Sequence, residues 1–228
     1  MHNDDLDKKQ QSFIAGKNPY AKRLNEINTA DLNRTQKNFE MGILANSNIP
    51  GHISTNKILP PTNLLTNRLE ANEFISRLNY EISRGLRYKR PLSLIMVSVD
   101  FLDNLLENWG EDTTYYLIEN VYNKIASKLR EIDLSGVYQS SILCFILPET
   151  NIRGATVVAN RMAKLIAQSQ FNHKLHTFNL SVSMGIASVP DNASNAIDLV
   201  DSTFIALQNA IQMYGGNQIV QAQAIRPK

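Results

Sequence analysis

Residues 136–147 decide the fold, and they read GVYQSSILCFIL. The runs at 136–140 and 142–147 are separated by a single residue, so they predict a tight β-hairpin. Strands joined by a tight hairpin pair antiparallel, whereas parallel strands need a long crossover between them. A hairpin in the middle of a chain of alternating helices and strands therefore predicts a mixed sheet flanked by helices, not a doubly wound parallel sheet.

Helical and extended patterns alternate on both sides of this hairpin. Apolar residues recur every third or fourth position in the helical segments. The expected helices cover residues 68–88, 117–129, 151–167 and 196–213, and the expected strands cover 92–99, 136–140, 142–147, 177–189 and 219–220. Gly215-Gly216 is typical of a helix end. The order is α-β-α-β-β-α-β-α-β, with about five strands in the sheet.

Residues 1–58 differ from the rest, because they are rich in Asn, Lys, Asp and Gln and their apolar residues are scattered. One short helix is expected from Thr29, as N-cap, to Leu44. Residues that interrupt helices and strands, such as Pro60-Pro61, indicate a linker at residues 46–61. This N-terminal extension cannot build its own core, so we expect it to dock on the domain or on a partner, or to stay mobile. The expected domain is 59–224, with a tail at 225–228.

The composition is that of an ordinary soluble globular protein, with 43% hydrophobic and 19% charged residues. The net charge is +2, so neither nucleic acid nor an anionic membrane is an expected partner. No apolar stretch approaches the roughly 18 residues of a membrane span, and the N-terminus is too polar for a secretory signal. The single cysteine, Cys144, lies in an apolar strand, where we expect it to be buried and inert. Cytoplasm is the expected location.

Five segments, in order and at matching spacings, resemble the GGDEF (diguanylate cyclase) family. They are Leu65-Thr66-Asn67-Arg68 with Phe74 beyond it, residues 94–100, Leu147-Pro148-Glu149-Thr150, residues 181–187 (SVSMGIA), and Ala206-Leu207 followed by Gly216-Asn217. The resemblance covers residues 60–222 or so. It implies the nucleotide-cyclase-like fold of that family, an α/β (α+β) fold with a central mixed five-stranded sheet flanked by helices.

The family's Gly-Gly-Asp/Glu-Glu-Phe signature falls on replaced residues. Counting back from Pro148, its positions are Gln139, Ser140, Ser141, Ile142 and Leu143. In the family the glycines let the hairpin turn approach the nucleotide closely. The acidic pair supplies a metal ligand and helps handle the attacking hydroxyl. Here none of these positions carries a glycine or a carboxylate.

The other catalytic positions that the resemblance implies are replaced as well. They fall on Ser98 (metal-binding Asp), Asp103 (Lys), Leu106 (guanine-reading Asn), Tyr115 (guanine-reading Asp) and Ile211 or Gln212 (phosphate-contacting Lys). Asp100 survives, but one carboxylate does not make a two-metal site. Joining two GTP molecules needs Mg²⁺, whose usual ligands are carboxylate oxygens. We therefore expect no cyclase activity, no catalytic residue, and no bound metal or other cofactor.

A different site of the family matches this sequence. Arg130-Glu131-Ile132-Asp133 has the form and position of the Arg-x-x-Asp motif that binds the product, cyclic di-GMP, as a stacked dimer in many family members. Arg161 stands where the family has an arginine on the next helix. Arg84 resembles an arginine that cross-links to this site from a neighbouring domain. Guanidinium groups suit phosphate oxygens and guanine O6/N7, and a carboxylate can accept from guanine N–H groups.

Plainer interpretations stay open for these residues. An R-x-x-D tetrad arises often by chance, and Arg130–Asp133 can be a surface ion pair worth about 0–1 kcal/mol. The cluster of Arg84, Arg87, Lys89 and Arg90 indicates a solvated helix end more than a nucleic-acid patch, since no aromatic interleaving is evident. For other residues we expect only structural roles: His173 and His176 as surface histidines, and Trp109 in packing.

Two functions follow from this sequence. The leading hypothesis is a non-catalytic cyclic di-GMP receptor, or effector, that signals to a protein partner, with residues 1–58 as the output or docking element. A homodimer cross-linked through Arg84 is compatible with it. The alternative is a ligand-independent scaffold whose partner surface includes the former catalytic face, apolar at Ile142 and Leu106. Binding of GTP without turnover and a new enzyme activity have little support in the residues.

Overall fold

The computed structural model describes residues 71–139, 141–212 and 216–224. The expected N-terminal extension with its helix at 29–44, the linker at 46–61 and the tail at 225–228 lie outside the described residues. All described residues fall within the domain expected at 59–224.

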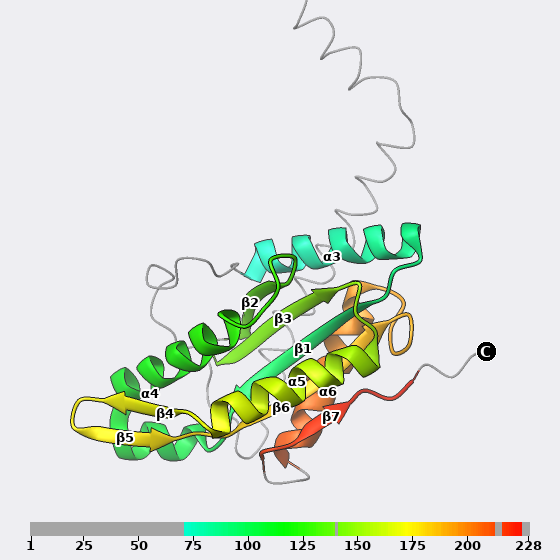
Figure 1. Ribbon diagram of the computed structural model, residues 1–228. Coiled ribbons are helices and arrows are strands. Elements are labelled where there is room, and N and C mark those ends of the chain that lie inside the picture. Colours follow the sequence, from blue (N-terminus) through cyan, green and yellow to red (C-terminus); the bar gives the residue numbers. More distant parts are fainter. Residues whose placement is uncertain (1–70, 140, 213–215, 225–228) are drawn as a thin grey trace, which may run out of the picture. The chain divides into compact units, whose positions relative to one another are not determined.

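A five-stranded sheet of order β2-β3-β1-β6-β7 forms the centre of the domain (Figure 1). Its strands are β1 (Leu92–Val99), β2 (Leu134–Gln139), β3 (Ile142–Pro148), β6 (Val182–Val189) and β7 (Ile219–Gln221). Strand β1 pairs antiparallel with β3 and β6, β2 pairs antiparallel with β3, and β7 pairs parallel with β6. The mixed five-stranded sheet predicted from the hairpin is confirmed.

Helices cover both faces of the sheet. Helices α3 and α6 pack on one face, and α4 and α5 pack on the other (Figure 1). Their bounds are Ala71–Tyr88 for α3, Leu102–Ala126 for α4, Ile152–Ala167 for α5 and Ala196–Gln212 for α6. Because strand side chains alternate between faces, two covered faces leave every residue of β1, β3 and β6 buried. This explains why their sequences are nearly continuous apolar runs.

Helix α6 crosses β6 at very close range over Gly185. A Cβ atom at this position would collide with the carbonyl oxygen of Thr203 and the amide nitrogen of Leu207. Only glycine lets the two backbones approach so closely. The glycine of the SVSMGIA segment therefore sets the distance between α6 and the sheet.

Helix α4 is longer than predicted. The apolar periodicity indicated a helix at 117–129, but the helix begins at Leu102. Gly110 interrupts it with φ 74° and ψ 174°, so two helical pieces meet at a kink. Glycine adopts this positive φ without a steric cost. The kink and the many polar residues of the first piece conceal its helical period in the sequence.

A separate two-stranded hairpin precedes β6. It consists of β4 (Gln170–His173) and β5 (His176–Asn179), which pair antiparallel. The single extended segment predicted at 177–189 is therefore wrong, because β5 and β6 belong to different sheets. Strand β4 was not predicted, since four residues give too short an alternating pattern to stand out.

Aromatic rings join this hairpin to α4. The Trp109 ring lies edge-on to His176 and Phe178, with centroids 4.5 Å and 5.0 Å away, and Tyr116 lies 4.2 Å from His173. The packing role expected for Trp109 is confirmed. His176 is exposed and His173 is partly exposed, with its Nε2 atom buried.

The single cysteine, Cys144, is fully buried in the middle of β3. Burial raises the pKa of its thiol far above the ordinary value. A protonated, inaccessible thiol is unreactive, as expected. Among the described residues, no helix is long and apolar enough to cross a membrane.

Candidate functional site

Three of the five signature positions, at and directly after the turn between β2 and β3, are buried. Ser141, Ile142 and Leu143 have exposed fractions of 5%, 8% and 1%. Gln139 pairs with Ile142 across a register shift in the ladder. Ser140 and the side chain of Gln139 lie outside the described residues. Since Ile142 is buried, it offers no surface to a partner, and the exposed apolar face expected there is wrong at this position.

Ser98 lies beside Ile142 in the sheet. It is the direct cross-strand partner of Ile142 on β3 and of Ser183 on β6. Ser98 is itself buried, and its hydroxyl donates to the carbonyl of Val99 at 3.3 Å. Ser98 and Ile142, two of the positions where the resemblance implies acidic residues, are thus adjacent here, and they hold a hydroxyl and an alkyl group.

Asp100, the acidic residue that survives at this end of β1, holds three segments together. Its Oδ1 accepts from the Ser183 hydroxyl at 2.6 Å. Its Oδ2 accepts from the Ser181 hydroxyl at 2.6 Å and from the amide of Asn217 at 2.9 Å. Both oxygens are therefore engaged by the start of β6 and the loop before β7. The carboxylate closes the structure here and is not presented to a ligand.

The other positions where the resemblance implies catalytic residues differ in their burial. Leu106 and Tyr115 are partly buried against the core that α4 and α5 share with the sheet, while Asp103, Ile211 and Gln212 are exposed. Burial, and then the charges of Glu111 and Asp112, raise the pKa of Tyr115. In the described part of the chain, no group of three or more His, Cys, Asp or Glu side chains is placed to hold a metal ion.

The Arg-x-x-Asp motif forms a closed turn between α4 and β2. The Asp133 Oδ2 atom accepts from the backbone N–H of Arg130 at 2.9 Å, and the Asp133 N–H donates to the Arg130 carbonyl at 3.0 Å. This reciprocal pair fixes the carboxylate against the backbone and leaves the Arg130 side chain exposed. Leu129, packed against the core, holds the turn on the domain.

Arg161 reaches this turn from α5. Its Nη2 donates to the carbonyl of Lys128 at 3.4 Å, directly before the motif. The positive charges of Arg130 and Arg161 both act on the Asp133 carboxyl. The structure therefore brings together three of the four residues predicted to bind a ligand.

The carboxyl of Asp133 is half-buried and incompletely satisfied. Burial raises its pKa, and the Arg130 N–H and the charges of Arg130 and Arg161 partly oppose that rise. Its Oδ1 atom is buried and has no hydrogen-bond partner among the described residues. Neither guanidinium forms an ion pair with it in the described ranges. The buried Asp133 oxygen can accept a hydrogen bond, and the guanidinium groups of Arg130 and Arg161 lie near it. This arrangement can bind a ligand that has both N–H donors and negative charge.

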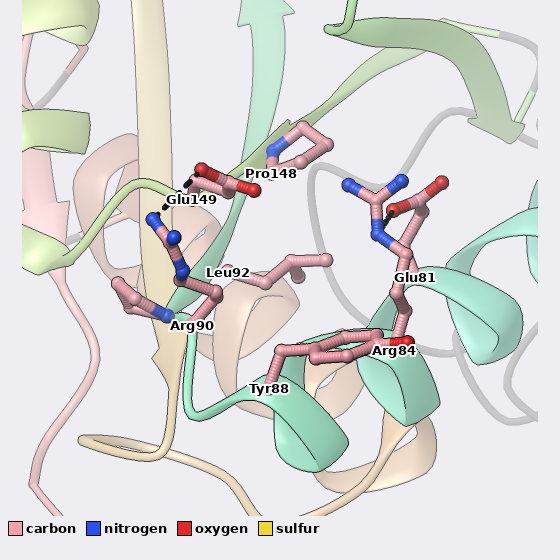
Figure 2. A pocket seen from close by; sticks show the side chains of 9 residues that line it. Glu81, Arg84, Tyr88, Arg90, Leu92, Pro148 and Glu149 are labelled. Atoms are coloured by element: carbon pink, nitrogen blue, oxygen red, sulfur yellow. Dashed lines mark hydrogen bonds and ion pairs between the residues drawn. The ribbon is translucent and has the colours of Figure 1, made fainter.

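Arg84, the fourth predicted residue, lies in a different place. It lines a pocket of about 210 Å³ between the end of α3 and the β1 and β3 strand ends (Figure 2). Two ion pairs flank this pocket, Arg84 Nε–Glu81 Oε2 and Arg90 Nη1–Glu149 Oε2, both at 3.2 Å. Leu92 and Pro148 lie between the two pairs, and the Tyr88 ring lies at one end.

The pocket contains residues that the sequence did not single out. Glu81 is only 6% exposed, and its Oε2 is close to Arg84 but not in hydrogen-bond geometry. The Arg90–Glu149 pair joins residues 59 positions apart, and no spacing rule links such residues. No hydrogen bond or ion pair joins Arg84 to the Arg130–Asp133 turn in the described part of the chain.

Comparison with known proteins decides the family. Residues 62–217, most of the chain, match the model described as "Diguanylate cyclase, GGDEF domain". The chain belongs to the GGDEF family. This GGDEF domain includes all the described elements from α3 to α6, the β2–β3 turn and the Arg130–Asp133 turn among them.

In the segments that align with the curated relatives, about a quarter of the residues are identical. Diguanylate cyclase A of Treponema denticola is 25% identical over 149 residues, which are 65% of this chain and 40% of that protein. The response regulator PleD of Caulobacter vibrioides is 24% identical over 132 residues, which are 57% of this chain and 29% of that protein. The matches thus span less than half the length of either relative.

Solved structures show the same fold. The GGDEF domain of PA1120 (YfiN or TpbB) from Pseudomonas aeruginosa has a TM-score of 0.66 at 18% identity, covering 71% of this chain and all of that one. The GGDEF domain of DgcB from Caulobacter crescentus, solved in complex with c-di-GMP, has a TM-score of 0.65 at 16% identity, covering 78% of this chain and 98% of that one. The predicted GGDEF fold is confirmed.

Proposed function

We propose that this GGDEF domain is a receptor of cyclic di-GMP that does not synthesise it. The observation that carries the proposal is the turn at Arg130 and Asp133, where a buried carboxylate oxygen with no hydrogen-bond partner among the described residues lies near two guanidinium groups. A buried acceptor without a partner costs free energy of about 1–3 kcal/mol, which a ligand donor can recover. Cyclic di-GMP offers guanine N–H donors together with phosphate charge.

Each side chain has a distinct task in the proposed complex. Asp133 Oδ1 accepts from a guanine N–H, while Oδ2 stays bound to the backbone and holds the carboxylate in place. Arg130 and Arg161 offer forked donors to phosphate oxygens or to guanine O6 and N7. The likeness of fold to the DgcB domain, which was solved with c-di-GMP, makes this ligand the first to test.

The residues of the former catalytic edge support a non-catalytic role. Mg²⁺ takes oxygen ligands, usually carboxylates, and offsets the charge of bound triphosphates. At this edge Ser98 and Ile142 replace two acidic positions, and both oxygens of Asp100 are held by protein donors. These residues do not fit a magnesium site, which favours a domain that does not join two GTP molecules.

Arg84 fits a dinucleotide held on a second copy of the domain. Its ion pair with Glu81 uses Nε, so the terminal nitrogens face the pocket region without an ion pair among the described residues. A homodimer bridged by the ligand would use Arg84 from one copy and Arg130, Asp133 and Arg161 from the other. In this proposal residues 1–58 carry the ligand-bound state to a protein partner.

Calorimetric titration of the full chain with cyclic di-GMP tests the proposal, with GTP as the control ligand. We expect a dissociation constant of about 1 μM or tighter for cyclic di-GMP, more than one dinucleotide per chain, and no heat with GTP. Incubation with GTP and Mg²⁺ should yield no cyclic di-GMP. Absence of binding would favour the alternative, a ligand-independent scaffold, and synthesis of the product would refute the non-catalytic role.

A substitution of Arg130 tests whether the ligand binds at this turn. Arg130→Ala should weaken binding by at least about tenfold, because a hydrogen bond to a charged group contributes about 1.5–3 kcal/mol. Arg153→Ala removes another exposed arginine, at the start of α5, and should leave the affinity unchanged. Equal affinities for the two variants would place the ligand elsewhere.

A further inference from the structure

The outer surface of α3 carries a narrow stripe of arginines and tyrosines. Successive helix residues turn by about 100°, so Arg77, Tyr80, Arg84, Arg87 and Tyr88 fall within an arc of about 100° beside the buried face, together with one acidic residue, Glu73. The neighbouring arc holds Ser76, Asn79, Ser83 and Leu86, which are uncharged. The positive charge of α3 is therefore concentrated on one flank.

Aromatic rings are part of this stripe. Tyr80 and Tyr88 are 58% and 61% exposed. The Arg77 guanidinium lies 5.6 Å from the Tyr80 ring centroid, and the Arg87 guanidinium lies 5.5 Å from that of Tyr88. The sequence interpretation that no aromatic residue interleaves with this cluster is wrong, since Tyr88 stands inside it. We name Arg77, Tyr80, Arg87 and Tyr88 the arginine–tyrosine face.

Helix α4 carries the opposite charge. Residues 102–119 contain five acidic residues and no lysine or arginine. Glu107, Glu111 and Asp112 are exposed, and none of them forms an ion pair within the described ranges. Trp109 is 41% exposed, and its ring packs on His176 and Phe178 of the β4–β5 hairpin. We name Glu107, Glu111 and Asp112 the acidic face.

The charge complementarity of these two faces points to a second copy of this chain as the partner, with the arginine–tyrosine face of one copy on the acidic face of the next. Arg, Tyr and Trp are the residues most enriched at the centres of protein interfaces. Arg77 and Arg87 form no ion pair in the described part of the chain, so both remain available to carboxylates of the partner.

The positions of the two faces set the kind of assembly. Helix α3 lies on the sheet face that it shares with α6, and α4 lies on the face shared with α5 (Figure 1). A contact between two different surfaces is heterologous, so each copy that joins leaves one face free for another. The association therefore continues beyond a dimer as the protein concentration rises. Its tests are separate from those of the proposed dinucleotide site, because they use no nucleotide and leave Arg130, Asp133, Arg161 and Arg84 unchanged.

Sedimentation velocity of the full chain without nucleotide tests this contact. We expect the average mass to exceed one chain and to grow with concentration in about 0.1 M salt. It should fall to one chain in about 1 M salt, where the Debye length shrinks from about 10 Å to about 3 Å. A single-chain mass up to millimolar concentration in low salt, or an assembly that salt leaves intact, would overturn the proposal.

Charge reversal identifies the surfaces. The variants Arg77→Glu/Arg87→Glu and Glu111→Arg/Asp112→Arg should each stay at the mass of one chain, because like charges then meet in every contact. An equal mixture of the two should associate again, since each native face finds its native partner and the two reversed faces also match. Circular dichroism of each variant checks that it is folded. Variants that associate like the unmodified chain, or a mixture that stays dissociated, would show that these faces do not pair.

Discussion

The two ends of strand β2 differ in almost every physical property. At the β2–β3 turn, Ser141, Ile142 and Leu143 are buried, and nearby Asp100 is fully hydrogen-bonded. At the other end, six residues away, Arg130 is exposed and Asp133 keeps a buried oxygen without a hydrogen-bond partner in the described structure. Near the first end the carboxylate oxygens of Asp100 already accept hydrogen bonds from the protein, whereas at the second end Asp133 keeps an oxygen that can accept one. Hydrogen-bond satisfaction thus differs between two ends of one strand that lie about 20 Å apart.

The largest effect should come from a carboxylate placed at the closed end. Ile142→Glu puts a charge at an 8% exposed position in the sheet, and burial of an unpaired charge should lower the free energy of unfolding by about 3 kcal/mol or more. Urea denaturation measures this loss. Ile132→Glu is the matched control, because Ile132 lies at the other end of β2 and is 51% exposed; its cost should stay within about 0.5 kcal/mol. A stable Ile142→Glu protein that turns over GTP would overturn the comparison.

A smaller loss is expected when the surviving carboxylate is changed. Asp100→Asn keeps the shape but turns one acceptor oxygen into an N–H donor, which then faces either the Ser183 hydroxyl or the Ser181 hydroxyl and the Asn217 N–H. Unfolding free energy should fall by about 2 kcal/mol, measured by urea denaturation. Exposed Asp191→Asn should change it little. If the two variants proved equally stable, Asp100 would be free for another role.

At the open end, ligand affinity should change while stability does not. Arg161→Lys keeps the positive charge near Asp133 but removes the planar fork, so cyclic di-GMP should bind about tenfold more weakly, a loss of about 1.4 kcal/mol. Calorimetry gives the affinity, and thermal denaturation should show an unchanged midpoint. Unaltered affinity would mean that Arg161 acts through charge alone or not at all.

The smallest effect is a pH dependence at Asp133. Its pKa lies above the ordinary value of 3.8, chiefly because of burial, so the folded chain holds this proton more tightly than the unfolded chain. The contribution of Asp133 to stability therefore falls as pH rises from 3.8 through the raised pKa. Urea denaturation of the unmodified chain and Asp133→Asn, from about pH 3.5 to about pH 6.5, measures it. As pH rises, the free energy of unfolding of the unmodified chain should fall relative to that of Asp133→Asn. A relative increase would contradict the raised pKa of Asp133.

Much of the fold was predictable because its signals are local. The run at 142–147 needs two covered faces, and that requirement alone indicates a sandwiched strand. The first half of α4 was not predictable in the same way, because Gly110 breaks the helical period with a positive φ. The 177–189 segment has the pattern of one strand, because the change of sheet near Leu180 and Ser181 leaves the apolar alternation almost unbroken.

The candidate site was predictable only in part. Arg130, Asp133 and Arg161 were chosen through family resemblance, and the structure places the two arginines around the carboxyl. Asp133 Oδ1, which has no hydrogen-bond partner in the described part of the chain, was not predictable, because burial of a single oxygen depends on how the chain packs around it. Likewise, the Arg90–Glu149 pair that flanks the Arg84 pocket joins two distant strand ends, which only the β1–β3 register brings together.

The thiol of Cys144 can report when the central sheet opens. It is the only cysteine in the sequence, it is fully buried, and it stands between Met96 and Gly136 of the neighbouring strands. An alkylating reagent can reach the sulfur only when β3 separates from these strands, so the rate of modification reports the free energy of that separation. The stability of the sheet centre can thus be followed at one natural atom, without an added label.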